Sequence, residues 1–336
     1  MKKLALSLFM GVILASVSLS VYAAQWQSKP IGKYQTNIYV PDSLSPVGNG
    51  RSLMLNLHGC SQTHDHLLDA DWQSVADEWG MVVVLPFSTN QVLLGCYPYA
   101  SNYGMQRTTE LANFIELTEI LLADSDLNID ANQVYVSGLS AGGGFAMFAA
   151  CSHPEIFAGV GLDATPAFIQ LIGATPNSPS NIKSTCESLA TDKTAFATQI
   201  MSTANGTSDN MVNFAHAEAN ATAYAMLYGV ETAENEREVN TLSPTATESV
   251  WKDSRISKVI MNNVIHAWPG GENSTMNPGG FGGIGGNYVD NTSINYGMYL
   301  ADFFAENNLR VDPEEENTPP KIDSFSVSAD EDSLLI

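Results

Sequence analysis

Apolar and polar positions alternate along this chain in blocks that predict strands and helices in turn. Continuous apolar runs at 52–57 and 81–85 are typical of strands that are buried on both faces of a parallel sheet. Helical spacing of apolar residues is found at 71–79 and 109–123. Regular alternation predicts an α/β fold with a doubly wound, mostly parallel sheet and helices on both faces. Further elements are expected as strands at 34–40, 134–136, 157–162 and 259–265 and as a helix at 143–151.

The two ends of the chain depart from this alternation. Residues 1–23 have a basic start, an apolar run and the small-residue pattern Val21-Tyr22-Ala23, which indicates a secretory signal peptide rather than a membrane anchor. The main domain is expected at 25–310, followed by an acidic, proline-containing linker at 311–321. Residues 322–336 alternate like one strand, which fits either the start of a truncated β-module or an edge strand added to the main domain.

Two internal stretches also break the pattern. Residues 165–194 are rich in Ser, Thr, Pro and Asn and could form a cap. Residues 270–287 are rich in glycine and follow the last predicted strand, so they could border a substrate groove or form an ordinary loop.

Composition narrows the classes of partner. The 336 residues, 44% of them hydrophobic, are enough for a large core. With 14 basic and 36 acidic residues the net charge is −22, which argues against a nucleic-acid partner and against attraction to anionic membranes. Together with the signal peptide, these features predict a soluble secreted protein, extracellular or periplasmic in transit.

The four cysteines are even in number and suit an oxidising compartment. Three pairings are possible. Pairing of Cys60 with Cys96 and of Cys151 with Cys186 is favoured, because each bond would tie a loop near the candidate site to its neighbour. Metal ligation is disfavoured because the chain has no Cys-x-x-Cys motif.

The strongest chemical signal lies at 134–145, where a short apolar strand leads into a turn and a helix start. The turn has the form Gly138-x-Ser140-x-Gly142, a nucleophile elbow, in which a strained backbone projects the serine hydroxyl above the sheet. The strand before it and the helix after it distinguish it from a chance Gly/Ser turn. Ser140 is therefore the predicted nucleophile of an acyl-transfer reaction.

A serine nucleophile needs a histidine base and a carboxylate that orients the base. In sheets of this kind the chain order is serine, acid, histidine. His266 is the favoured base because it follows the last predicted strand, whereas His153 ends the helix after Ser140 and His216 lies in an alanine-rich helical stretch. For the acid, Asp209 lies in a turn between Ser140 and His266 and is favoured, with Asp163 as the alternative.

Backbone N–H groups are expected to stabilise the oxyanion of the tetrahedral intermediate. Ala141 follows the nucleophile, and Cys60 lies on the turn after the strand at 52–57, the two positions that usually supply these donors. His58 precedes the nucleophile in the chain and is therefore predicted to support this turn rather than to act as the base.

No metal or cofactor is expected. His64-Asp65-His66 lacks a third ligand nearby. The run beginning at Asp124 imitates a calcium loop, but Ile129 stands at its glycine position and Tyr135 at its glutamate position.

Four motifs occur in one order along the chain. They are Leu57-His-Gly-Cys-Ser-Gln62, Gly138-Leu-Ser-Ala-Gly-Gly143, Gly206-Thr-Ser-Asp209 and His266-Ala-Trp-Pro-Gly-Gly271. Over roughly residues 30–308 the chain resembles the esterase family of extracellular poly(3-hydroxybutyrate) depolymerases, and feruloyl and acetylxylan esterases are similar.

The resemblance implies an α/β-hydrolase fold in which 25–310 is the catalytic domain. It implies Ser140 as nucleophile, Asp209 as acid and His266 as base, with the amides of Cys60 and Ala141 as the oxyanion hole.

Trp268 and Tyr97 are candidate substrate contacts. The expected activity is that of a secreted serine esterase that cleaves short-chain polyhydroxyalkanoate polyester or its oligomers through an acyl-enzyme, without a cofactor. Two alternatives remain open, a feruloyl or acetylxylan type of carbohydrate esterase and a non-catalytic secreted binding protein on a hydrolase fold.

Overall fold

The computed structural model describes most of the expected main domain. The described residues are 24–168, 170–171, 175–230, 233–239, 246–251, 254–277, 286 and 288–311. The predicted signal peptide, the linker beyond residue 311, the stretch 322–336 and half of the glycine-rich stretch lie outside these residues.

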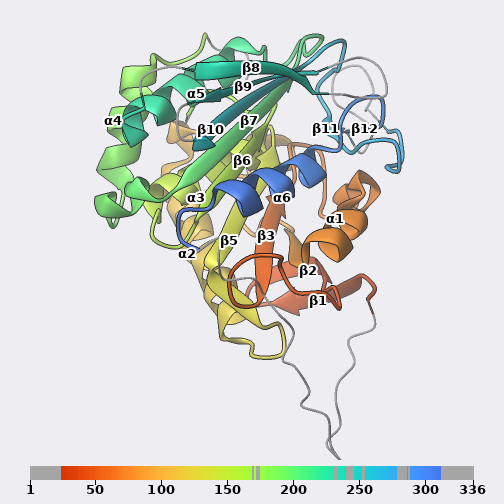
Figure 1. Ribbon diagram of the computed structural model, residues 1–336. Helices are drawn as coiled ribbons and strands as arrows, with labels where there is room; N and C mark the ends of the chain where they lie inside the picture. Colours follow the sequence, from red (N-terminus) through yellow and green to blue (C-terminus); the bar gives the residue numbers. More distant parts are fainter. Residues whose placement is uncertain are drawn as a thin grey trace, which may run out of the picture.

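A ten-stranded sheet runs through the described residues in the order β1-β2-β4-β3-β5-β6-β7-β10-β9-β8 (Figure 1). The six strands from β4 to β10 in this order are parallel, and antiparallel strands are added at both edges. The strands are β1 (Gln27–Ile31), β2 (Tyr34–Tyr39), β3 (Arg51–Leu57), β4 (Met81–Pro86), β5 (Ile129–Leu139), β6 (Gly159–Asp163), β7 (Ile200–Gly206), β8 (Ala233–Val239), β9 (Ala246–Trp251) and β10 (Ile256–Met261).

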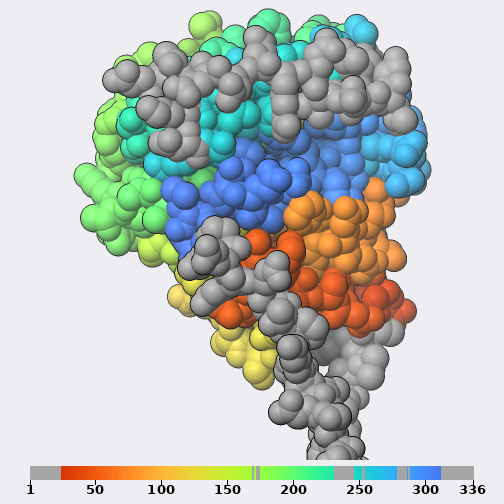
Figure 2. All heavy atoms as spheres, in the orientation of Figure 1, coloured from red at the N-terminus to blue at the C-terminus, as the bar shows by residue number. Residues whose placement is uncertain are grey.

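Helices cover both faces of this sheet, as predicted. α1 and α6 pack on one face, which Figure 2 shows in orange and blue, and α2, α3, α4 and α5 belong to the core on the other. The helices are α1 (Trp72–Trp79), α2 (Gly104–Ala123), α3 (Ala141–Ser152), α4 (Pro179–Leu189), α5 (Ala215–Tyr228) and α6 (Tyr296–Asn307). None of the helices within the described residues combines the length and the apolar character that crossing a membrane requires.

The continuous apolar runs form the centre of the sheet because both faces of these strands are buried. All six residues of β4 are buried, and in β3 only Arg51 at the start is partly exposed. A strand with one face in water would alternate polar with apolar residues. Covered strands of this kind bring their carboxyl ends to one edge, where the loops that carry the candidate site begin.

The bounds of one predicted strand were wrong, and four strands of the sheet, β1, β7, β8 and β9, were not predicted. The strand expected at 259–265 is β10, which begins at Ile256 and ends at Met261. Strand β10 ends at Met261, opposite Gly206 at the end of β7. The chain after Met261 then passes close to Gly206, where a Cβ would lie 2.1 Å from the carbonyl oxygen of Val264. Strand β7 was not predicted at all.

The polar residues of β7 concealed the strand. Ser202, Thr203 and Asn205 are buried although their side chains are polar. The hydroxyl of Ser202 accepts hydrogen bonds from Ser257 at 2.8 Å and from Tyr296 at 2.9 Å. Such partners offset the cost of removing polar groups from water, so periodicity of apolar residues alone does not reveal the strand.

The predicted cap also differs from the expectation. Helix α4 lies within 165–194 and packs on α3 and α5. A disulfide between Cys151 and Cys186 joins α3 to α4, the pairing favoured from the sequence. Helix α4 therefore lies against two of the helices that cover the sheet, and none of the described residues of this segment lines the cavity beside Ser140.

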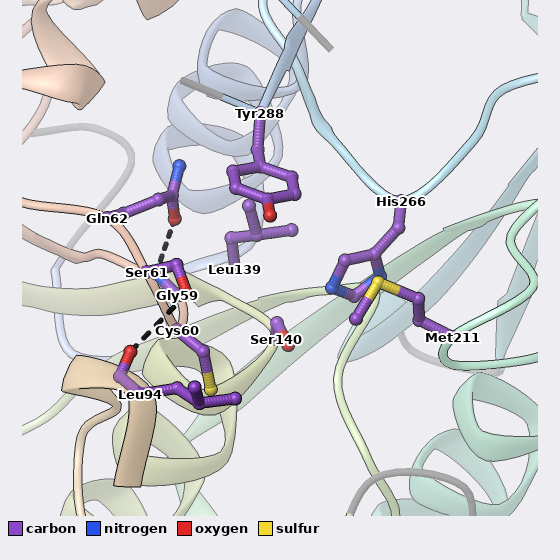
Figure 3. Close-up of a pocket in the computed structure, with 10 residues that line it drawn as sticks. All are labelled: Gly59, Cys60, Ser61, Gln62, Leu94, Leu139, Ser140, Met211, His266 and Tyr288. Atoms are coloured by element: carbon purple, nitrogen blue, oxygen red, sulfur yellow. Dashed lines mark hydrogen bonds between the residues drawn. The ribbon is translucent and has the colours of Figure 1, made fainter. Parts of the chain in front are cut away.

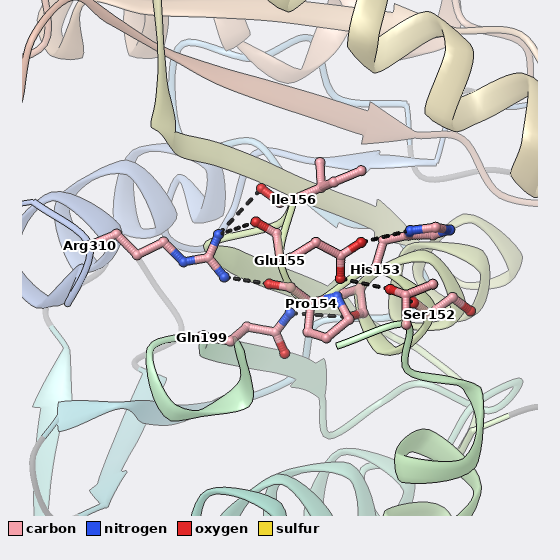
Figure 4. Close-up of polar contacts among 9 residues, drawn as sticks. Ser152, His153, Pro154, Glu155, Ile156, Gln199 and Arg310 are labelled. Atoms are coloured by element: carbon pink, nitrogen blue, oxygen red, sulfur yellow. Dashed lines mark hydrogen bonds and ion pairs between the residues drawn. The ribbon is translucent and has the colours of Figure 1, made fainter. Parts of the chain in front are cut away.

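Arg310, near the end of the described residues, forms hydrogen bonds to the loop after α3 (Figure 4). Its guanidinium donates hydrogen bonds to the carbonyl oxygens of Pro154, Glu155 and Phe157, the last two at 3.0 Å and 3.2 Å. In the same loop, Glu155 lies 2.9 Å from Nδ1 of His153. The contacts hold the carboxyl end of α3, the helix whose amino end follows Ser140.

Candidate active site

Ser140 lies between the end of β5 and the start of α3, in the turn that the motif predicts. Its φ of 55° and ψ of −117° are strained for a residue with a Cβ. The N–H of Ser140 donates to the carbonyl oxygen of Asp163 at 2.9 Å. A Cβ at Gly142 would lie 2.2 Å from the carbonyl oxygen of Leu57, so only glycine fits there. The sharp turn thus depends on both the strand contacts and the glycine.

His266 and Asp209 meet directly. Nδ1 of His266 lies 2.8 Å from Oδ2 of Asp209, and both residues are buried. The other carboxylate oxygen accepts from the N–H groups of Met211 and Val212, each at 2.8 Å. An ionised carboxylate is an acceptor only, so Nδ1 of His266 must donate, which leaves Nε2 free to accept a proton.

The ring of His266 and the side chain of Ser140 line the same cavity (Figure 3). The three residues follow the ends of β5, β7 and β10, which are parallel strands of one sheet. The structure thus brings together the three side chains that the motif order predicts for a nucleophile, an acid and a base.

Asp163, the alternative acid, is not hydrogen-bonded to His266. It ends β6 and is buried, and neither of its carboxyl oxygens has a hydrogen-bond partner within the described residues. Burial raises the pKa of Asp163 well above its usual value, and the nearby charges of Asp209 and Asp290 raise this pKa further. The environment therefore favours the neutral form of this carboxyl group.

We expect Asp163→Asn to stabilise the protein at pH 8. The pKa of Asp163 is higher in the folded than in the unfolded protein. Below about pH 3.8 both states hold the proton and this difference costs no stability. As pH rises from there toward the folded-state pKa, the unfolded state loses the proton first and the folded protein becomes less stable. An amide cannot ionise, so the free energy of unfolding should rise at pH 8, by about 1.4 kcal/mol for each pH unit over which only the folded state holds the proton of Asp163. Urea denaturation at pH 4 and pH 8 measures this difference.

The matched control is Asp126→Asn, which makes the same substitution at an exposed carboxylate. An Asp163→Asn variant that is no more stable than the wild type at pH 8 would show that Asp163 is ionised or solvated in the folded protein.

The turn that carries Cys60 is held from several sides. A disulfide joins Cys60 to Cys96, the second pairing that the sequence favoured. The N–H of Ser61 donates to the carbonyl oxygen of Leu94 at 2.7 Å, and the N–H of Gly59 donates to the side-chain oxygen of Gln62 at 2.6 Å. These bonds, two of which Figure 3 draws, fix the direction of the backbone at the cavity wall.

Ala141 is the first residue of α3. The N–H groups of the first helical turn have no acceptor inside the helix, and the positive end of the helix dipole favours a negative charge there. Cys60 lines the cavity after the end of the neighbouring parallel strand, β3. The two predicted oxyanion donors are therefore on backbone segments that border Ser140.

His58 is buried beneath this turn as a neutral ring. Its Nδ1 lies 2.9 Å from the carbonyl oxygen of Gly59, and its Nε2 accepts from the N–H of Ser88 at 3.3 Å. Burial lowers the pKa of His58 to about 4. With both ring nitrogens occupied, His58 fits the supporting role predicted for it.

The other two histidines after Ser140 also have other partners. Nδ1 of His216 accepts from the N–H of Ala167 at 2.9 Å, inside the core. His153 pairs with Glu155 at the far end of α3. Neither histidine lines the cavity beside Ser140.

This cavity has a volume of about 70 Å³ and a largely apolar wall (Figure 3). Its lining residues are Gly59, Cys60, Ser61, Gln62, Leu94, Leu139, Ser140, Met211, His266 and Tyr288. Tyr288 was missed by sequence reasoning, since it follows the glycine-rich stretch and belongs to no motif. Nothing in its neighbours along the chain indicates that it lies beside His266.

The prediction that Trp268 and Tyr97 contact substrate directly is not supported. Both are fully buried and neither lines the cavity. Trp268 packs between Trp72 and Tyr296, with ring centroids 5.4 Å and 5.5 Å away. The hydroxyl of Tyr97 donates to the carbonyl oxygen of Pro86 at 2.8 Å. Large aromatic side chains near a site are often part of its core support rather than of its surface.

The described residues contain no group of three or more His, Cys, Asp or Glu side chains arranged to hold a metal ion. At His64-Asp65-His66, Nδ1 of His66 accepts from the N–H of Thr63, and Asp65 accepts from Asn37. These side chains thus take part in local hydrogen bonds.

The sheet order, the strained turn at Ser140 and the neighbouring His–Asp pair define an α/β-hydrolase fold. An acetyl xylan esterase from Aspergillus awamori has this fold, with a TM-score of 0.55 and 17% sequence identity over 72% of this chain and 93% of that one. The chain matches the family described as Esterase PHB depolymerase over residues 37–234, and it belongs to that family.

Two relatives with similar sequences are also esterases or depolymerases by name. A poly(3-hydroxybutyrate) depolymerase from Ralstonia pickettii is 34% identical over 292 residues, which cover 81% of this chain and 58% of the relative. A feruloyl esterase B from Neurospora crassa is 29% identical over 167 residues, 46% of this chain and 52% of the relative. The chain thus spans a little over half the length of these two relatives.

Proposed function

We propose that this protein is a serine esterase that hydrolyses short-chain poly(3-hydroxyalkanoate) esters, such as poly(3-hydroxybutyrate) or its oligomers, through an acyl-enzyme. The observation that carries the proposal is the hydrogen bond between His266 and Asp209 beside the strained Ser140 turn. The family of the chain and its 34% identity to a depolymerase support the polyester as substrate.

In the first half of the reaction, Nε2 of His266 takes the proton of Ser140 as its oxygen attacks the ester carbonyl carbon. The resulting oxyanion accepts hydrogen bonds from the N–H groups of Cys60 and Ala141. Asp209 stabilises the imidazolium and keeps its Nδ1 proton in place. When the intermediate collapses, His266 gives its proton to the departing alkoxide, and the acyl group remains on Ser140.

In the second half, a water molecule replaces the alcohol. His266 takes one of its protons while the water oxygen attacks the acyl carbon, and the same two N–H groups hold the new oxyanion. Collapse returns the proton to Ser140 and releases the acid. Every proton moves between the ester, water, Ser140 and His266, so the cycle needs no metal or cofactor.

The wall of the cavity supports an aliphatic substrate. Leu94, Leu139 and Met211 supply apolar surface beside Ser140. Leu94 is 68% exposed and Met211 is 39% exposed, so both could also contact the continuation of a chain outside the cavity. Apolar walls with a few placed polar groups are the usual construction of small-molecule sites.

We also propose that the protein is secreted. The two disulfides join described parts of the main domain, as expected for an oxidising compartment. The basic and apolar residues of the predicted signal peptide at 1–23 support the same conclusion.

A carbohydrate esterase of the feruloyl or acetylxylan type is the second candidate. It is favoured by the similarity to a feruloyl esterase and by the shared fold with an acetyl xylan esterase. In such substrates the acyl groups are side groups on sugars, whereas in the polyester the ester groups lie in the main chain.

Parallel assays of the secreted protein on three substrates separate these candidates. We expect acid release and clearing of suspended poly(3-hydroxybutyrate), with much slower release from feruloyl esters and acetylated xylan. Turnover of feruloyl esters without any cleavage of polyester or its soluble oligomers would contradict the proposed substrate. The Ser140→Ala protein is the control for hydrolysis that does not depend on the site.

A further inference from the structure

Tyr288 places a hydroxyl group in the cavity that no step of the proposed mechanism uses. The side chain is 6% exposed and its hydroxyl points toward the space between Leu139, Ser140 and His266 (Figure 3). No hydrogen-bond partner for this hydroxyl is found among the residues that the structure describes. A tyrosine hydroxyl in an apolar cavity usually has a partner, so this one is available to a ligand.

The backbone holds Tyr288 in an unfavourable conformation. Its φ is 55°, in the left-handed region that bulky residues rarely adopt. Strain of this kind persists where the surrounding structure imposes it, and it is concentrated at functional sites. In this conformation the side chain of Tyr288 lies at the wall of the cavity.

The same short strand pair positions Tyr288 and His266. Residues Trp268–Pro269 form β11 and residues Val289–Asp290 form β12, and the two strands are parallel. The N–H of Trp268 donates to the carbonyl oxygen of Tyr288 at 2.7 Å. Because the Trp268 ring is anchored in the core, this pairing fixes both residues relative to the sheet. Trp268 therefore positions His266 and Tyr288 through backbone contacts and not through its side chain.

The Tyr288 ring meets the His266 ring edge to face, with centroids 6.4 Å apart and an interplanar angle of 81°. In the proposed mechanism His266 faces the departing alcohol, whereas the ester carbonyl oxygen faces Cys60 and Ala141. In Figure 3 the Tyr288 side chain reaches into the cavity from the wall opposite Leu94. The ring contact with His266 places Tyr288 beside the base, and therefore beside the alcohol half of the substrate in the proposed mechanism.

We propose that Tyr288 recognises an ester carbonyl in the alcohol half of the substrate, by donating its hydroxyl proton in a hydrogen bond. This inference rests on the proposed function, because a 3-hydroxyalkanoate chain carries such a carbonyl on the alcohol part of every ester bond, whereas simple alkyl esters do not. Tyr288 is then a specificity-determining residue for hydroxyacid esters. Burial also raises the pKa of Tyr288, which keeps the hydroxyl protonated in alkaline solution.

A matched pair of soluble substrates tests the proposal. Both are acetate esters of secondary alcohols, one of ethyl 3-hydroxybutyrate and the other of 2-hexanol, and release of acetate is measured for each. Only the first has a carbonyl in its alcohol half. We expect the wild type to prefer it, and we expect Tyr288→Phe to lower the ratio of the two kcat/KM values by about five- to tenfold, the effect of losing one hydrogen bond.

Tyr288→Phe keeps the ring that packs against His266, and Tyr103→Phe is the control, since it removes a tyrosine hydroxyl outside the cavity. An unchanged ratio would overturn the proposal, whether both rates fall equally or neither falls. A wild type that prefers the first acetate but does not cleave poly(3-hydroxybutyrate) or its oligomers would contradict the proposed substrate while supporting the role of Tyr288. A wild type that cleaves neither acetate would contradict both.

Discussion

Replacing Ser140 by alanine is expected to lower kcat for ester hydrolysis by about 10⁶-fold, the loss found when a triad serine is removed. Without the hydroxyl no acyl-enzyme forms, and His266 has no nucleophile to activate. The remaining oxyanion donors still bind the substrate carbonyl, so KM should change far less than kcat. Steady-state kinetics on a soluble 3-hydroxybutyrate oligomer measure both quantities.

The expected loss is chemical and leaves the fold intact. Ser140 is the residue before α3 and its hydroxyl has no hydrogen bond to the described protein, so the melting temperature of the variant should be close to that of the wild type. Ser101→Ala, which changes an exposed serine, is the matched control and should retain full activity. A loss of less than about 100-fold for Ser140→Ala would mean that another group attacks the ester.

Asp209→Asn is expected to lower kcat by about 10⁴-fold, as in other triads that lose the carboxylate. The amide nitrogen at this position would donate to Nδ1 of His266. The ring would then carry its proton on Nε2, where it cannot accept the proton of Ser140. The geometry of the site would change little, so the effect should appear in kcat rather than in KM.

Asp163→Asn is the matched control for this substitution. Asp163 is a buried carboxyl group one strand away from Asp209, but it makes no hydrogen bond to His266. We expect the control to lose less than about tenfold in kcat, because it leaves the hydrogen bond between His266 and Asp209 in place. A larger loss in Asp163→Asn than in Asp209→Asn would assign the acid to the end of β6.

Much of this site could be predicted because its chemistry depends on short local patterns. The Ser140 turn requires glycines at fixed positions, and the glycine at 142 meets the β3 backbone as the motif demands. The order of serine, acid and histidine follows from a parallel sheet, in which successive loops return to one edge. Asp209 and His266 were chosen from that order, and the structure places them within hydrogen-bonding distance of each other.

The remaining features depend on contacts between distant parts of the chain. The strand β7 is polar in sequence. It is stable in the core because the hydroxyls of Ser257 and Tyr296 donate hydrogen bonds to the hydroxyl of Ser202. Trp268 looks like a surface contact in its motif, yet its ring is buried against Trp72. Local sequence patterns do not identify such partners. For the same reason they did not predict that Tyr288 lines the cavity.

A fluorescent phosphonate that reacts with activated serines tests the central claim most directly. The phosphorus takes the place of the ester carbonyl carbon, so labelling requires the nucleophile, the base and the oxyanion donors together. Mass spectrometry of the digested wild type then locates the adduct. We predict a single adduct on Ser140, none in Ser140→Ala and much slower labelling in Asp209→Asn. An unlabelled wild type, or an adduct on another residue, would contradict the account and favour a non-catalytic binding protein or a different nucleophile.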